Sequence, residues 1–121
     1  MLYAILCYHS EDVVGSWTKE EDDAVMAKLA VVQENFAKRG KLGPVARLLP
    51  TTAATTLRKG REPVVIDGPF AETKEQLLGF YVVDCANLDE AIETARELGR
   101  DEHGALEIRP LRLFQPGSRT A

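Results

Sequence analysis

The fold is decided by the stretch Leu2-Tyr3-Ala4-Ile5-Leu6-Cys7-Tyr8, in which nearly every residue is apolar or aromatic. Side chains of a strand alternate between two faces, so apolar residues at both odd and even positions predict a strand that is covered on both sides. Residues 77–83 form a second dense apolar run. We therefore expect these two segments to be the buried central strands of one sheet.

Two helices are predicted outside these strands. The first has the capping-box spacing at Thr18 and Glu21, continues with apolar residues at helical spacing, and ends before Gly40. The second begins at Asn87 and is closed by Gly99. Its expected buried face consists of Leu88, Ala91, Ile92, Ala95 and Leu98.

The remaining segments are less regular. Turn residues at 59–62 predict a hairpin loop, and the apolar pattern changes parity near Pro110, which predicts a bulge there. Residues 1–114 are expected to form one domain, followed by a flexible tail at 115–121. The other expected elements are a loop at 9–17 and strands at 42–49, 51–57, 64–66 and 105–113.

This order of elements is an α+β fold, the split βαβ sandwich, with an inserted β-hairpin. Two helices can cover only one face of such a sheet, yet the two central strands are apolar on both faces. A second copy packed sheet against sheet would cover the other face. Burying ~800 Å² per subunit at ~25 cal/mol/Å² gives about 20 kcal/mol before association costs. We therefore expect a homodimer.

The composition excludes several classes of function. The chain has 121 residues and a formal charge of −4, without the basic face that a nucleic-acid binder needs. No apolar run is long enough to cross a membrane, and the first residues lack the basic flank and cleavage site of a signal peptide. Two distant cysteines and two distant histidines predict neither a disulfide framework nor a metal site. We expect a cytoplasmic protein with reduced cysteines.

The most distinctive motif is Asp67-Gly68-Pro69-Phe70-Ala71-Glu72-Thr73-Lys74-Glu75-Gln76. Gly68 and Pro69 predict a rigid, sharp turn directly after a strand, with Phe70 folded back as an apolar plug. Asp67 could accept hydrogen bonds from the backbone of its own turn, or it could point into a cleft as a base. In the second case the Lys74 ammonium would favour the charged carboxylate. Both interpretations stay open.

Three segments of the chain, Asp67–Phe70, Glu72–Glu75 and Gly79–Tyr81, resemble the signature of the DGPF-domain branch of the YCII-related proteins. The resemblance covers nearly the whole chain. It implies a ferredoxin-like fold that dimerises into an α+β barrel, and a bacterial, cytoplasmic protein. Members are mostly uncharacterised, and some are encoded beside or fused to extracytoplasmic-function sigma factors.

The wider YCII-related group is suspected of enzymatic activity because of a His–Asp pair in a cleft, and one branch removes chloride from an aromatic ring. The family pattern places the histidine early in the first helix. Here that position reads Lys19-Glu20-Glu21-Asp22-Asp23, without histidine. The substitute upstream is His9, which follows the first strand and could approach Asp67 or stay a solvated loop residue. His103 is expected to be a plain loop residue.

Two alternative functions follow. In the first, the chain is a cofactor-free enzyme for a small aromatic or carbonyl compound, in which Asp67 with His9 moves a proton and Lys74 holds developing negative charge. In the second, it is a non-catalytic small-molecule-binding or regulatory module associated with an extracytoplasmic-function sigma factor. No metal or nucleic acid enters either alternative. The residues expected to hold a substrate, unless they are core aromatics, are Tyr8, Phe70 and Tyr81.

Overall fold

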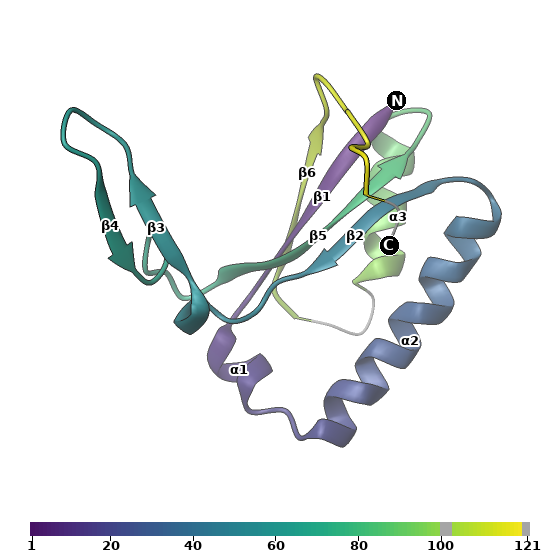
Figure 1. Ribbon diagram of the computed structural model, residues 1–121. Coiled ribbons are helices and arrows are strands. Elements are labelled where there is room, and N and C mark those ends of the chain that lie inside the picture. Colours follow the sequence, from purple (N-terminus) through teal and green to yellow (C-terminus); the bar gives the residue numbers. More distant parts are fainter. Residues whose placement is uncertain (100–102, 120–121) are drawn as a thin grey trace.

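The computed structural model describes residues 1–99 and 103–119. The strands of its main sheet are β1 (Leu2–His9), β2 (Leu42–Arg47), β5 (Gln76–Asp84) and β6 (Ala105–Pro110). They are antiparallel and lie in the order β2-β5-β1-β6 (Figure 1). Strands β1 and β5 occupy the centre, which confirms the position predicted from their dense apolar runs.

The described part of the chain has the α-helices α1 (Glu11–Gly15), α2 (Lys19–Lys38) and α3 (Leu88–Leu98). The predicted capping box of α2 is confirmed: Thr18 Oγ1 accepts the Glu21 N–H at 3.0 Å, and Glu21 Oε1 accepts the Thr18 N–H at 3.2 Å. Helix α3 begins as predicted, because Asn87 Oδ1 accepts the backbone N–H of Glu90 at 3.0 Å. Within residues 1–99 and 103–119, no helix has the length and apolar character that a membrane span requires.

The hydrophobic core lies between the main sheet and the helices. Ile5 of β1 and Val83 of β5 are fully buried at its centre. Phe36 anchors α2 to this core, and α3 contributes residues at helical spacing. Both long helices therefore cover the same face of the sheet. The buried core residues are Tyr3, Ile5, Phe36, Tyr81, Val83, Cys85, Ala91, Ala95 and Leu98.

The opposite face of the sheet, here called the helix-free face, is also apolar. Its residues alternate along the strands with those of the core face, because successive side chains point to opposite sides. Leu6, Tyr8 and Phe80 are half-buried on this face. The core packing of α2 and α3 leaves it without a helical cover. The helix-free face consists of Ala4, Leu6, Tyr8, Phe80 and Val82.

A second sheet of two strands projects from the main body. Strands β3 (Thr55–Arg58) and β4 (Val64–Asp67) pair with each other in antiparallel register, and the predicted hairpin loop at 59–62 joins them. This unit, here called the hairpin arm (residues 55–67), stands away from the main sheet and the helices (Figure 1). A short 3₁₀ helix, η1 (Thr51–Ala53), leads into it.

Two segments near the arm differ from the prediction. The expected loop at 9–17 contains α1, because the side chain of Ser10 accepts the Val13 N–H at 3.4 Å and acidic residues occupy the first turn. The expected strand at 51–57 begins only at Thr55. Before it, the Glu11 carboxylate accepts the backbone N–H of Thr51 at 2.6 Å and also its hydroxyl, which holds the chain in the 3₁₀ turn.

Three strand and helix ends were also predicted wrongly. Strand β2 ends at Arg47, so Leu48 and Leu49 are exposed outside it. Strand β6 ends at Pro110 and has no bulge. Its partner strand β1 begins at Leu2, and the carbonyl of Leu2 accepts the backbone N–H of residue 111 as the last bond between them. Leu88 is exposed at the start of α3 and does not belong to its buried face.

Candidate functional site

A cavity of about 410 Å³ lies between the main sheet and the helices. The sheet strands form one wall. Helix α2 contributes Met26, Leu29 and Gln33 to the other wall, and α3 contributes Ile92. Trp17, which precedes α2, lies at the end of the pocket where β1 finishes. The pocket is thus a continuation of the core in which apolar side chains leave space unfilled.

His9, the last residue of β1, is an ionisable group whose ring is oriented by two contacts in this pocket. Its Nδ1 accepts the backbone N–H of Ser10 at 2.7 Å. An acceptor nitrogen carries no proton in the neutral ring, so the proton lies on Nε2. The ring also meets Trp17 edge to face, with centroids 6.0 Å apart and planes at 88°. His9 can therefore present a fixed N–H donor to a molecule in the pocket.

The charged residues of the pocket are basic. Arg47 and Arg96 line it together with His9 and His103, and among the described lining residues none is acidic. Arg47 binds Asp22 of α2 through two hydrogen bonds of 2.6 and 3.1 Å. The hydrogen bond from Arg47 holds the pKa of Asp22 below its ordinary value. This ion pair fixes the end of β2 against α2 at the side of the pocket.

Three of the six predicted site residues lie at this pocket: His9, Tyr8 and Tyr81. Tyr81 belongs to the core face. Strand alternation directs the Tyr8 side chain to the helix-free face, so Tyr8 borders the pocket mainly through its backbone. The structure thus places one predicted proton carrier and one predicted aromatic together.

The other three predicted residues, Asp67, Phe70 and Lys74, lie on the arm or directly after it and do not line the pocket. All three are exposed, and the Phe70 ring is contacted by the guanidinium of Arg58, whose carbon is 5.4 Å from the ring centre. Among the described residues, the carboxylate of Asp67 forms no hydrogen bond or ion pair. One chain therefore does not bring Asp67 to His9. The predicted roles of these residues remain untested.

The Gly68 turn of the motif has a visible structural role. Gly68 has a φ of 109°, in the region that residues with a Cβ rarely adopt. Its N–H donates to the carbonyl of Ala54 at 2.8 Å, and its own carbonyl accepts the Thr56 hydroxyl at 2.8 Å. The turn therefore closes the base of the hairpin arm and sets the direction in which the arm leaves the body.

Sequence reasoning missed the residues that complete the pocket. Trp17 was assigned to a loop, and the pocket role of Arg47 depends on a partner 25 residues away, Asp22. His103, expected to be a plain loop residue, also lines the pocket. The one available signal was the single tryptophan of the chain directly before a helix cap, where a solvated loop seldom needs such a side chain.

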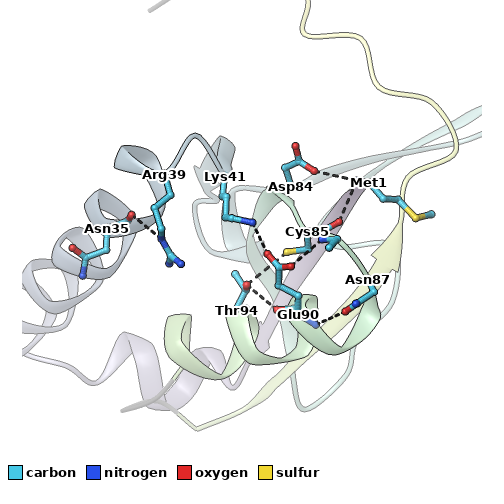
Figure 2. Close-up of polar contacts among 10 residues, drawn as sticks. Met1, Asn35, Arg39, Lys41, Asp84, Cys85, Asn87, Glu90 and Thr94 are labelled. Carbon is cyan, nitrogen blue, oxygen red and sulfur yellow. Dashed lines mark hydrogen bonds and ion pairs between the residues drawn. The ribbon is translucent and has the colours of Figure 1, made fainter.

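A second polar cluster lies at the opposite end of the main sheet, where β1 begins and β5 ends (Figure 2). Lys41 Nζ and Glu90 Oε1 are 2.5 Å apart, and Glu90 Oε2 accepts the Ala86 N–H at 3.1 Å. The Lys41 hydrogen bond lowers the pKa of Glu90, and the same bond raises the pKa of Lys41. The terminal ammonium of Met1 donates to Asp84 nearby. These groups satisfy one another, which indicates a structural cluster.

Neither end of the sheet has an assembled metal site. In the part of the chain that the structure describes, no group of three or more His, Cys, Asp or Glu residues is placed to hold a metal ion. Neither cysteine is in a disulfide: Cys85 is buried in the core, and Cys7 is half-buried against it. The ionisable and aromatic side chains that line the pocket include imidazoles, guanidinium groups and aromatic rings.

Comparisons with known proteins show the family of the chain and name no activity. The sequence model of the YCII-related domain matches residues 1–115. An uncharacterized protein of Rhizobium meliloti (strain 1021) is 59% identical over 120 residues, which is 97% of each chain. The similarity thus extends over the sheet, the helices and the arm together.

Proposed function

Because the chain belongs to the YCII-related domain family over nearly its whole length, we propose that its sheet and helices enclose a binding site for a small aromatic molecule. The observation that carries this proposal is the pocket of about 410 Å³ beside His9. Pockets for small ligands commonly measure ~300–1,000 Å³ and combine apolar walls with a few polar groups. The pocket described above has both properties.

The polar groups indicate which end of the ligand they bind. With Nδ1 accepting the Ser10 N–H, the His9 ring offers an Nε2 proton, and the charged lining residues Arg47 and Arg96 are donors without acceptor capacity. A carbonyl, carboxylate or phenolate oxygen matches these donors, while an ammonium group would find no carboxylate among the described residues that line the pocket. The aromatic part of the ligand would pack against Trp17 and the apolar side chains of α2.

Acid–base chemistry is the reaction class that this pocket supports. Proton transfer would require the ring to release the Ser10 N–H and to take a proton on Nδ1. The resulting imidazolium could give its Nε2 proton to a bound carbonyl or phenolate oxygen, and the neutral ring could later take a proton back at Nε2. This step needs no cofactor. A binding module without turnover would use the same donor only to orient its ligand, so the two alternatives differ in whether His9 changes protonation state.

Binding is tested with a library of aromatic carboxylates, phenols and aryl ketones. A ligand at ~100 times its dissociation constant adds about 2.7 kcal/mol of stability, which raises the melting temperature by several degrees. Trp17 is the one tryptophan of the chain, so its fluorescence reports the pocket directly. We expect hits among these acceptor-bearing aromatics and none among arylalkylamines, which carry an ammonium group at neutral pH and are screened beside them.

A matched pair of variants on α2 locates the site. Leu29 lines the pocket, whereas Val31 is 64% exposed on the same helix. Leu29→Phe should fill part of the pocket and weaken binding, and Val31→Phe should bind like the wild type. Equal binding by both variants, or hits that leave Trp17 fluorescence unchanged, would contradict the proposed site.

The variant His9→Gln distinguishes hydrogen bonding by His9 from proton transfer by His9. The glutamine amide can donate a hydrogen bond but cannot transfer a proton at neutral pH. If the protein is an enzyme, this variant should bind the ligand and lose turnover, as followed by NMR of the ligand. If wild type binds without turnover, the protein is a binding module and the acid–base alternative is wrong.

A further inference from the structure

Two basic residues of the pocket lie at the same end of the main sheet. His9 ends β1, and Arg47 ends β2. Arg47 pairs with Gly79, and Gly79 also pairs with Cys7 on its other side. The ends of β1 and β2 therefore lie level with each other across the sheet, and each brings one basic side chain to this end of the pocket.

Two more basic residues reach this end from the other side of the sheet. Arg96 lies in the last turn of α3. Three residues further on, a Cβ at Gly99 would lie 2.9 Å from the side chain of Leu106, near the start of β6. The backbone beside His103 comes equally close to β1, because a Cβ at the following glycine would lie 3.3 Å from the Cα of His9. Four separate parts of the chain thus supply the basic groups that line the pocket.

The two arginines differ in how firmly their charge is already bound. Arg47 holds the Asp22 carboxylate through two hydrogen bonds, which offsets its charge. Arg96 pairs with Glu93, one turn before it on α3, at 3.1 Å, and these two side chains are 69% and 73% exposed. An ion pair between exposed side chains contributes little to stability. Arg96 can therefore exchange Glu93 for an anion in the pocket with little loss.

The rest of the pocket suits an anion that carries an aromatic ring. The walls supply apolar side chains and Trp17, and none of the described lining residues is acidic. The whole chain has a net charge of −4, so the basic pocket is a local reversal of its overall charge. A planar guanidinium binds a carboxylate through two parallel hydrogen bonds, which gives Arg96 a preferred partner among anions.

We propose that the ligands of this pocket are aromatic carboxylates and that Arg96 is the residue that selects them. This inference rests on the binding site for small aromatic molecules proposed above. The carboxylate lies against the Arg96 guanidinium, and the ring packs among the apolar side chains of the walls. The Nε2 proton of His9 then remains for a carbonyl or hydroxyl oxygen elsewhere on the ligand.

The first test compares ligands of nearly equal shape that differ in charge. Benzoate and 2-naphthoate are ionised at neutral pH, whereas benzamide and 2-naphthamide are neutral. Calorimetric titration should find that wild type binds each carboxylate about tenfold more tightly than its amide, and that Arg96→Gln removes this difference. Arg96→Lys keeps the charge without the planar fork, so it should recover part of the difference.

Arg39→Gln is the matched control. It removes the same charge at the opposite end of α2, where Arg39 donates to the carbonyl of Asn35 (Figure 2), and Arg39 does not line the pocket. This variant should bind both ligand series like the wild type. Equal losses of carboxylate binding in Arg39→Gln and Arg96→Gln would show that Arg96 acts only through the net charge, which would overturn its selecting role.

A further measurement needs no variant. Raising the salt concentration from ~0.05 M to ~0.5 M should weaken carboxylate binding several-fold and leave amide binding unchanged, because salt screens exposed charges. If wild type binds carboxylates and amides equally, with the same response to salt, this inference is wrong while the binding site for aromatic molecules stands. If neither series binds, the proposed function fails, and the selecting role of Arg96 fails with it.

Discussion

Replacement of Gly104 by alanine should destabilise the fold strongly, because two independent constraints meet at this position. Gly104 precedes β6 and has a φ of 103°, which residues with a Cβ rarely adopt. An alanine Cβ would overlap the carbonyl oxygen of Tyr8 on the neighbouring strand. It would also lie 3.3 Å from the Cα of His9. The backbone that positions the pocket histidine would have to move.

The two costs can be added to a rough total. A left-handed backbone costs a residue with a Cβ about 1–2 kcal/mol, and overpacking that forces backbone shifts costs about 1–3 kcal/mol. We therefore expect Gly104→Ala to lose about 3 kcal/mol of the free energy of unfolding. For a domain of this size, such a loss lowers the melting temperature by roughly 10 °C. Urea unfolding and calorimetry would measure both quantities.

Gly40→Ala is the matched control for this prediction. Gly40 also has a positive φ, 67°, but a Cβ there would meet no atom within 4 Å. It should therefore lose only the conformational part, about 1 kcal/mol. If Gly104→Ala and Gly40→Ala unfold at the same temperature, the close approach to Tyr8 has no energetic weight and the reasoning is refuted.

Two further predictions concern groups outside the pocket. Thr18→Ala removes one half of the α2 capping box and should cost about 1 kcal/mol in urea unfolding, while Thr52→Ala, an exposed threonine of η1, should cost much less. The pKa of Glu90 is lowered in the fold, so its ionised form stabilises the protein above the ordinary glutamate pKa, and this contribution is lost as the pH falls. Lys41, the partner of Glu90, stays charged until the pH is strongly alkaline, because its own pKa is raised. Glu90→Gln should therefore melt below wild type near pH 7 and level with it at about pH 3; an equal difference at both values would rule out the ion pair as the cause.

The elements that the sequence predicted well are those whose determinants are local. The capping box at Thr18 and the cap at Asn87 lie within four residues of the helices that they begin. The central strands were identified from their own apolar runs. Helix α1 was missed because it has only five residues and its N-cap, Ser10, is the one local signal for it. A contact between Glu11 and Thr51, which are 40 residues apart, adds to its stability.

The candidate site was harder to predict because it depends on how strands that are far apart in the sequence are arranged in space. The sequence left open whether His9 approaches Asp67, because both residues follow strands. His9 ends a strand of the main sheet, whereas Asp67 ends a strand of the separate hairpin. No local pattern distinguishes these two cases. The pocket walls are likewise formed by residues of α2 and α3 whose periodicity is the same as that of ordinary core residues.

The contact between Glu11 and Thr51 has a mechanical consequence. Glu11 begins the short helix that follows His9, and Thr51 begins the turn that leads into the arm. A guest molecule that displaced α1 would have to carry the root of the arm with it or break this contact. If such a molecule shifts the arm when it binds, a partner that holds the arm would change the affinity of the pocket for that molecule. The molecule would change the affinity for that partner by the same factor.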